Sequence, residues 1–178
     1  VISSAATFSA AENQTAIGSV TATDAEGDTL TYAVSGTELA ISSTGVLTFV
    51  SAPDYETKSS YTATVTVNDG VNNTTQAITV TVTNVNDVAP VISSAATFSA
   101  AENQTAIGSV TATDAEGDTL TYAVSGTELA ISSAGVITFK TAPDFETKSS
   151  YTATVTVNDG LNDTTPAITA TVTTLNAV

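Results

Sequence analysis

Short segments in which apolar and polar residues alternate recur along the whole chain. In residues 61–68 the apolar positions are Tyr, Ala, Val and Val, and the positions between them are three Thr and one Asn. Residues 78–83 repeat the pattern with Ile and Val against Thr. A period of two predicts β-strands with one face toward a core. No segment of helical length has an apolar period of 3.6 residues, so the pattern predicts an all-β protein.

Turn signals rich in Gly, Pro, Asp and Asn separate these segments, as at Asn68-Asp69-Gly70. Threonine is the commonest residue, 37 of 178, and its β-branch suits a pleated surface. Seven short strands are expected in the first half of the chain, near residues 6–11, 17–23, 29–35, 38–42, 45–50, 60–68 and 75–84. This number of short strands in about 90 residues predicts a seven-stranded immunoglobulin-like β-sandwich.

The chain contains an internal duplication. Residues 1–88 and 91–178 are identical at 76 of 88 aligned positions. We therefore expect two tandem domains of one fold, residues 1–88, with a linker at 84–90, and residues 91–178. The linker contains no Gly or Ser, unlike a flexible tether. Such similar copies suggest an array, and the start at Val1 suggests a piece of a longer protein, so we expect further copies on both sides.

Composition excludes several functions. The chain has 18 acidic residues against 3 basic ones, a formal net charge of −15. This charge excludes the basic footprint of a nucleic-acid-binding protein and basic docking on anionic lipid. No apolar run approaches the roughly 18 residues of a membrane span, so we expect no membrane insertion. The chain has no Cys and no His, which excludes disulfides, zinc–sulfur sites and His-based catalytic triads.

The acidic residues are concentrated in the inferred loops and strand ends, whereas Thr and Ser keep the strand surfaces polar. Each copy has nine acidic residues. In the first copy they are Glu12, Asp24, Glu26, Asp28, Glu38, Asp54, Glu56, Asp69 and Asp87. Asp favours turns, but Glu does not, and Asp24/Glu26 and Asp54/Glu56 form pairs at i, i+2. The pattern indicates carboxylate clusters with a function.

The acidic motifs occur in a particular order. It runs Ala11-Glu12-Asn13, Asp24-Ala25-Glu26, Asp54-Tyr55-Glu56, Asn68-Asp69-Gly70 and the linker Asn84-Val85-Asn86-Asp87-Val88-Ala89-Pro90. This ordered set, in a repeat of matching length, resembles the cadherin repeat over the whole of both copies. The Thr-rich, near-identical copies look most like bacterial cadherin-like repeats, as in large repetitive surface adhesins and some polysaccharide-active proteins.

The cadherin resemblance implies Ca²⁺ at the junction between the two repeats. The implied ligands are Glu12, Asp54 and Glu56 of the first copy, Asn86, Asp87 and the Val88 carbonyl of the linker, and Asp114, Glu116, Asp159 and, as a further candidate, Asp118 of the second copy. Asn84 stands where the family has Asp, and Glu116 is longer than the family's Asp, so either two or three ions are expected. Ala177 replaces the second copy's counterpart of Asp87, so partial or empty sites are expected at the free ends.

The chemistry of the residues supports calcium independently. Ca²⁺ takes six to eight oxygen ligands, and a site without His or Cys is a hard-oxygen site. Two carboxylates about 4 Å apart repel by roughly 4 kcal/mol at an effective dielectric constant of 20. Seven carboxylates gathered at one junction therefore need a counter-charge, and no Lys or Arg is expected there.

The favoured function is a calcium-rigidified spacer in a bacterial cell-surface adhesin, whose partners are adjacent repeats of the same chain. The alternative is a calcium-dependent module that binds polysaccharide or a second copy of itself. An enzyme is not expected, because a glycosidase-like pair such as Asp54/Glu56 has no other catalytic support. The Thr rows also resemble ice-binding faces, although they are equally the solvent side of a sheet. Tyr55 and Phe145 are expected to pack in the protein rather than stack on sugar.

Overall fold

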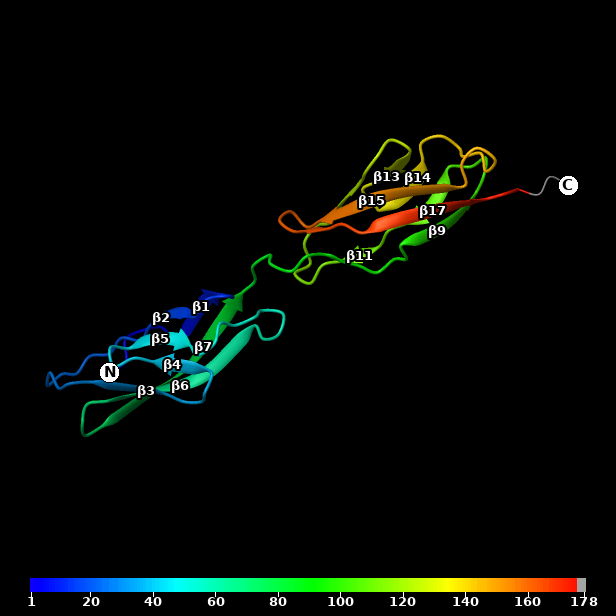
Figure 1. The fold of residues 1–178 in the computed structure, drawn as a ribbon. Helices are drawn as coiled ribbons and strands as arrows, with labels where there is room; N and C mark the ends of the chain where they lie inside the picture. The colour runs from blue at the N-terminus through cyan, green and yellow to red at the C-terminus, as the bar shows by residue number, and fades with distance from the viewer. Residues whose placement is uncertain (176–178) are drawn as a thin grey trace. The chain divides into compact units, whose positions relative to one another are not determined.

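The computed structural model describes residues 1–175. The chain forms two compact units, Val1–Val85 and Asn86–Val178, and each is described by itself. All regular elements among the described residues are strands (Figure 1). None of the described residues belongs to a helix long and apolar enough to cross a membrane.

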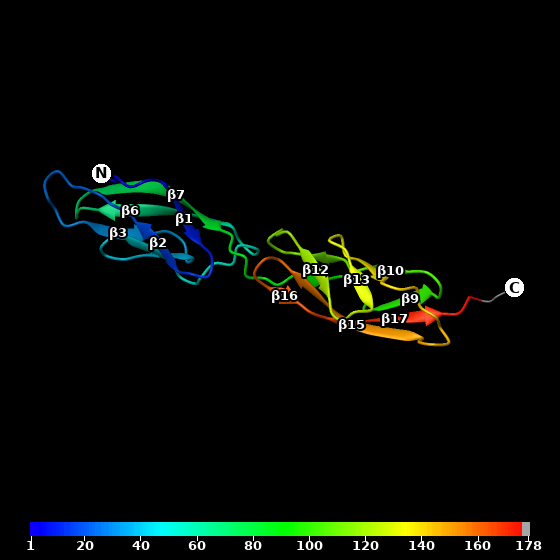
Figure 2. The same cartoon turned by 90° about the horizontal axis from the view of Figure 1, so that it is seen from above.

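The first unit is a sandwich of two sheets. Its strands are β1 (Thr7–Ala11), β2 (Ala16–Ser19), β3 (Thr31–Val34), β4 (Leu39–Ile41), β5 (Val46–Phe49), β6 (Ser60–Asn68) and β7 (Asn73–Thr83). One sheet has the order β1-β7-β6-β3 and the other β2-β5-β4. The pairing of β1 with β7 is parallel and the other pairings are antiparallel (Figures 1 and 2). Each of the seven strands expected from the sequence has a counterpart.

The second unit repeats this arrangement with two differences. Its strands are β8 (Val91–Ile92), β9 (Thr97–Ala101), β10 (Ala106–Ser109), β11 (Ala112–Thr113), β12 (Thr121–Val124), β13 (Leu129–Ile131), β14 (Val136–Phe139), β15 (Ser150–Asn158), β16 (Asp163–Thr164) and β17 (Ala167–Thr173). β8 pairs with β11, where the first unit has one bridge between Ile2 and Ala22. Pro166 replaces Gln76 and has no N–H to donate, so the counterpart of β7 is divided into β16 and β17.

The core of each unit lies between the sheets, where the apolar positions of the alternating strands meet. In the first unit Leu47, Val65 and Val80 have no exposed surface, and Phe49 is 2% exposed. Full burial of each such side chain stabilises the fold by roughly 1.5–3 kcal/mol. The ring of Phe49 meets that of Tyr61 edge to face, with 5.0 Å between the ring centroids. The Thr residues between the apolar positions of β6 are exposed or half-buried, as the period predicts.

One turn requires glycine. Gly45 lies between β4 and β5 with a φ of +81°, and a Cβ there would lie 2.2 Å from the carbonyl oxygen of Val20. The N–H of Val20 donates to the Gly45 carbonyl at 2.8 Å, which joins the two backbones. Gly135 repeats this close approach to Val110. The turn between β4 and β5 thus holds the segment that follows β2, and the equivalent turn does the same in the second unit.

Candidate metal-binding site

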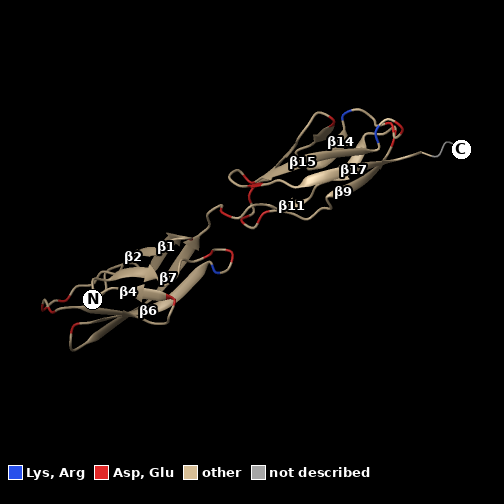
Figure 3. Cartoon of the chain, viewed as in Figure 1, with Lys and Arg blue, Asp and Glu red and all other residues tan. Residues whose placement is uncertain are grey.

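The loops at both ends of each unit are acidic, and the strands are almost free of charge (Figure 3). Within single units, three groups of three carboxylates among the described residues have one oxygen each within 4.8 Å of the others. Two of these groups are equivalent in the two units, Glu12, Asp54 and Glu56 in the first and Glu102, Asp144 and Glu146 in the second. Another, formed by Asp114, Glu116 and Asp118, belongs to the second unit. Acids of these motifs therefore lie close together within each unit, and their role as ligands of a shared junction stays a prediction.

Glu12 organises the acidic group of the first unit. It follows β1 and is 3% exposed. Its Oε1 accepts a hydrogen bond from the N–H of Val85 at 2.7 Å, and its Oε2 accepts one from the N–H of Tyr55 at 2.7 Å. One carboxylate thus joins the end of β1, the loop before β6 and the residue at the end of the unit. The parallel pairing of Ala11 with Thr83 brings these segments together.

Asp54 and Glu56 lie in the loop that Glu12 holds. The Oδ1 of Asp54 accepts from the N–H of Thr57 at 3.1 Å, and its Oδ2 accepts from the Thr57 hydroxyl at 2.8 Å. These bonds from the hydroxyl and N–H of Thr57 hold the pKa of Asp54 below its ordinary value. The carboxylate therefore stays charged at neutral pH and can supply oxygen ligands to a cation.

The start of the second unit gathers a second set of oxygens. The Oδ1 of Asp114 accepts from the N–H groups of Glu116 at 3.1 Å and Asp118 at 3.0 Å. The Oδ2 of Asp114 is buried and has no hydrogen-bond partner. A buried carboxylate oxygen without a donor is costly, whereas a bound cation would satisfy it. Within this unit an oxygen of Asp87 also lies within 4.8 Å of one of Glu116.

Asp159 and Asn86 are two further candidate ligands of the second unit, and hydrogen bonds join Asn86 to the loop that contains Asp159. The Nδ2 of Asn86 donates to the carbonyl of Asp159 at 3.4 Å, and its Oδ1 accepts from Nδ2 of Asn162 at 2.7 Å. Asp159 is 6% exposed. Burial raises the pKa of Asp159, but hydrogen bonds from the N–H groups of Asn162 and Leu161 and from the side chains of Asn162 and Asn86 outweigh it and lower the pKa overall.

Val88 and the acids at the free ends of the two units complete the set of residues expected from the sequence. Val88 is 37% exposed, in the segment that leads to Pro90, whose carbonyl accepts from the hydroxyl of Thr164 at 2.6 Å. In the first unit Asp24, Glu26 and Asp28 are described but do not form one of the close groups of three, unlike their counterparts in the second unit. Asn176 and Ala177, on which the expectation of a weaker final site depends, lie outside the described residues.

The donor set fits calcium. Every side-chain ligand is a carboxylate or an amide oxygen, and the chain has no Cys or His to favour zinc or copper. Lys58 is paired with Glu38 and Lys148 with Glu128, outside these clusters. Ca²⁺ is thus the cation whose ligand preference these oxygens match.

Sequence reasoning missed two features of the site. Asn162, which holds Asn86, is one, and the buried Asp114 Oδ2 is the other. The Asn158-Asp159-Gly160 turn was a signal for the first, since the loop that follows such a turn must lie beside Asp159. The second depends on side-chain burial, which no motif reports. Tyr55 and Phe145 pack against the cores of their units.

Comparison with known proteins identifies the class. The family described as bacterial Ig domain matches residues 1–83 and 86–174, so the chain belongs to that family and contains it twice. Among solved structures, human protocadherin-24 EC1-2 has a TM-score of 0.80 and 22% identity, covering 96% of this chain and 94% of that one. Chicken VE-cadherin EC1-2 has a TM-score of 0.66 and 22% identity, covering 94% and 98%.

These matches confirm an all-β fold of two immunoglobulin-like, cadherin-like repeats. A curated relative, Chitinase A of Pseudoalteromonas piscicida, is 35% identical over 145 residues, which are 79% of this chain. The match spans only 18% of that protein's length. The similarity is thus to one segment of the chitinase.

Proposed function

We propose that the chain is a calcium-rigidified spacer module of a bacterial cell-surface adhesin, outside the cell, with repeats at 1–88 and 91–178. In this proposal Ca²⁺ is held at the junction by Glu12, Asp54 and Glu56 from the first repeat, by the linker, and by acids of the second repeat. The adjacent repeats of the chain are the partners. The module itself catalyses no reaction.

The observation that carries the proposal is the anchoring of the two residues at the junction. Val85 is held by the carboxylate of Glu12, and Asn86 is held by the loop that contains Asp159. Consecutive Cα atoms are about 3.8 Å apart across a trans peptide, whatever the orientation of the flanking units. The acidic group around Glu12 is therefore held to Val85, and Asp159 is held to the next residue, Asn86. This connection favours ions that are shared between the repeats.

The buried Asp114 Oδ2 supports a cation in particular, because no donor reaches it. The net charge of −15 makes close approach of the acidic ends unfavourable without a counter-charge. Ca²⁺ would neutralise the junction and restrict the hinge between the repeats. A rod of such repeats would then hold a distal domain away from the cell.

Scattering tests this proposal directly. Small-angle X-ray scattering of the whole chain in Ca²⁺ should give a narrow set of extended shapes, and in chelator a broader set. A matched measurement in Mg²⁺ separates calcium binding from charge screening, since Mg²⁺ demands a tighter octahedral site. An identical distribution of shapes in Ca²⁺ and in chelator would contradict the spacer function.

Polysaccharide binding is a second candidate function. It is favoured by the match to a segment of Chitinase A, a protein named for activity on chitin. A repeat of this family could attach a secreted protein to a polysaccharide surface. Retention of the whole chain on insoluble chitin and on cellulose, compared with a protein of similar charge, tests this candidate.

A further inference from the structure

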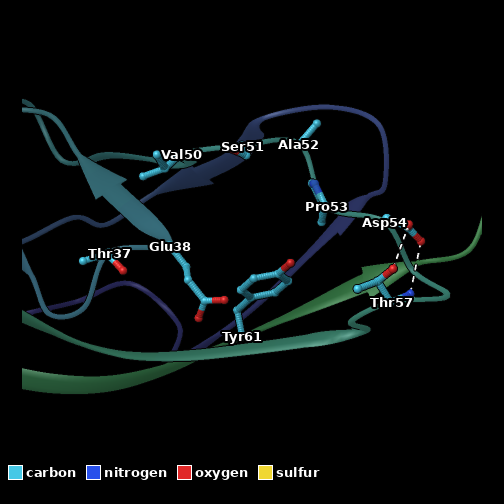
Figure 4. Close-up of a pocket in the computed structure, with 9 residues that line it drawn as sticks. All are labelled: Thr37, Glu38, Val50, Ser51, Ala52, Pro53, Asp54, Thr57 and Tyr61. Atoms are coloured by element: carbon cyan, nitrogen blue, oxygen red, sulfur yellow. Dashed lines mark hydrogen bonds between the residues drawn. The ribbon is translucent and has the colours of Figure 1, made fainter.

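Each unit has a surface pocket beside its acidic end, and most of the residues that line it have no part in the spacer function. In the first unit the pocket has a volume of about 330 Å³ and lies between the start of β4, the segment that follows β5, and β6. Figure 4 shows the ring of Tyr61 between the side chain of Glu38 and those of Asp54 and Thr57. Pro53 and Ala52 contribute apolar surface to the wall.

The polar groups of this pocket are held in place. Nζ of Lys58 donates to both carboxylate oxygens of Glu38, at 2.5 and 2.7 Å, and lies 4.4 Å from the ring centroid of Tyr61. The same ring packs edge to face on Phe49. One lysine therefore fixes both a carboxylate and an aromatic ring. Fixed groups bind a ligand at lower entropic cost than mobile ones.

The second unit repeats the pocket in full. Its volume is about 340 Å³, and it is lined by the equivalent residues, including Glu128, Asp144 and Tyr151. Lys148 holds Glu128 at 2.6 and 2.7 Å and lies 4.5 Å from the ring centroid of Tyr151. The lip differs, because Lys140 replaces Val50. The same pocket, with the same lysine, carboxylate and tyrosine, is thus present in both units.

We propose that each pocket is a subsite for an uncharged, hydroxyl-rich sugar unit of a polysaccharide. This inference rests on the second candidate function and assigns its binding site. The carboxylates of Glu38 and Asp54 can only accept hydrogen bonds, and sugar hydroxyls can donate to them. The Tyr61 hydroxyl can donate and accept, and the surface of Pro53 and Ala52 suits the C–H groups of a sugar ring.

The charge of the first unit's pocket disfavours anionic sugars, whereas Lys140 balances the charge of the second unit's pocket. In the first unit Glu38 and Asp54 outnumber the single cation Lys58, which is already paired with Glu38. An anionic sugar would be repelled there, whereas an uncharged sugar meets acceptors without an electrostatic cost.

The pocket and the acidic group of the first unit share Asp54, so the test leaves that residue unchanged. The ¹⁵N-labelled whole chain is titrated with chitotriose in chelator, so that calcium does not occupy Asp54, and amide shifts are followed by NMR. Shifts are expected near Glu38, Thr57 and Tyr61, and at the equivalent positions of the second unit. The same titration with trigalacturonate, an anionic trisaccharide, should give weaker binding.

Two double variants test the assignment, Glu38→Gln with Glu128→Gln, and Tyr61→Phe with Tyr151→Phe. The first replaces a charged acceptor with a neutral amide and the second removes a hydroxyl, and both keep the packing, so each should weaken chitotriose binding at least about fivefold. The control is Thr64→Ala with Thr154→Ala, exposed positions of β6 and β15 that do not line the pockets, which should leave affinity unchanged. The ¹⁵N spectrum of each variant reports whether the fold is retained.

The outcomes separate the pocket from the candidate function. If the chain binds chitotriose but the pocket variants bind equally well, or the control alone weakens binding, the pocket assignment is overturned and polysaccharide binding survives. If the chain binds neither chitotriose nor insoluble chitin, both are overturned, while the calcium spacer is unaffected. Tighter binding of trigalacturonate overturns the class of sugar.

Discussion

The buried carboxylate of Glu12 accepts a hydrogen bond at 2.7 Å from the backbone N–H of Val85, 73 residues later in the chain. Glu102 repeats the bond with the N–H of Leu175 at 2.8 Å. Glu12 directly follows β1 and Val85 follows β7, and Glu102 and Leu175 stand in the same relation to β9 and β17. In each unit, one glutamate thus holds the backbone just after the last strand. A single side chain therefore connects the fold of a unit to the segment that follows it.

Replacement of Glu12 with Gln should destabilise the first unit by about 1.5–3 kcal/mol, because a charged acceptor of two buried N–H groups is lost. Urea unfolding of the whole chain in chelator measures this change. Glu38→Gln is the matched control, since the Glu38 side chain is exposed and its ion pair contributes little. Equal effects of the two substitutions would show that the buried bonds do not matter.

Calcium should raise the melting temperature. The folded acidic groups can bind the ion, and the unfolded chain should not, so each site adds about 2.7 kcal/mol at 100 times its Kd. Affinities near 10⁻⁴–10⁻³ M are expected, as in extracellular modules. Calorimetry in a calcium series gives both the melting temperature and the stoichiometry. A melt that is the same in calcium and in chelator rules out binding linked to folding.

Asp87→Ala should reduce the number of bound calcium ions and broaden the distribution of inter-domain orientations, without unfolding either unit. The substitution removes a charge and an oxygen ligand that lies beside Glu116, far from both cores. Titration calorimetry and residual dipolar couplings measure the two effects.

Asp28→Ala is the control for Asp87→Ala. It removes the same charge in the first unit, where Asp24, Glu26 and Asp28 do not form a close group of three. It should change neither measurement. If Asp87→Ala also changes neither the number of bound calcium ions nor the inter-domain orientations, the proposed junction site is wrong.

Acid should weaken the first unit partly through Asp69. The N–H groups of Asn72 and Val71 hydrogen-bond to this carboxylate and lower its pKa. A pKa that is lower in the folded state gives stability that is present above the unfolded value, near 3.9, and is lost as the pH falls through the folded value. Asp69→Asn should therefore flatten the acid limb of urea midpoints measured between about pH 2 and 6 in chelator. An unchanged acid limb would contradict this role.

Leu47→Ala should cost about 2–5 kcal/mol, because Leu47 has no exposed surface and its loss leaves a cavity between the sheets. Val46→Ala, next in sequence but 45% exposed, should change stability far less. Thermal and urea unfolding measure both. Similar losses at the two positions would mean that the alternation does not define the core.

The strands were predictable because alternation in segments such as residues 61–68 directly reflects which side of a sheet is buried. The division of the last strand at Pro166 was not predicted, although proline in a strand was the signal. The short pair β8–β11 was missed because two-residue strands have no period. The grouping of Glu12 with Asp54 and Glu56 was predictable from the order of the acidic motifs, because the fold brings the loops at one end of a unit together.

Other parts of the sites could not be read from the sequence. The buried oxygen of Asp114 depends on how neighbouring loops cover it. The proposed sugar pocket depends on the position of Lys58 over Tyr61, three residues along the chain, and on its contact with Glu38. Such relations arise only when side chains from separate segments of the chain meet.

The parallel pairing of β1 with β7 has a mechanical consequence. Residues 1–6 lead into β1, and the chain leaves the unit after the end of β7, with a register that runs from Thr7 beside Thr79 to Ala11 beside Thr83. A pull on the two ends of the unit therefore slides these strands past each other. Their hydrogen bonds are loaded together in shear rather than broken one after another, so each unit should resist a tensile force applied to its two ends.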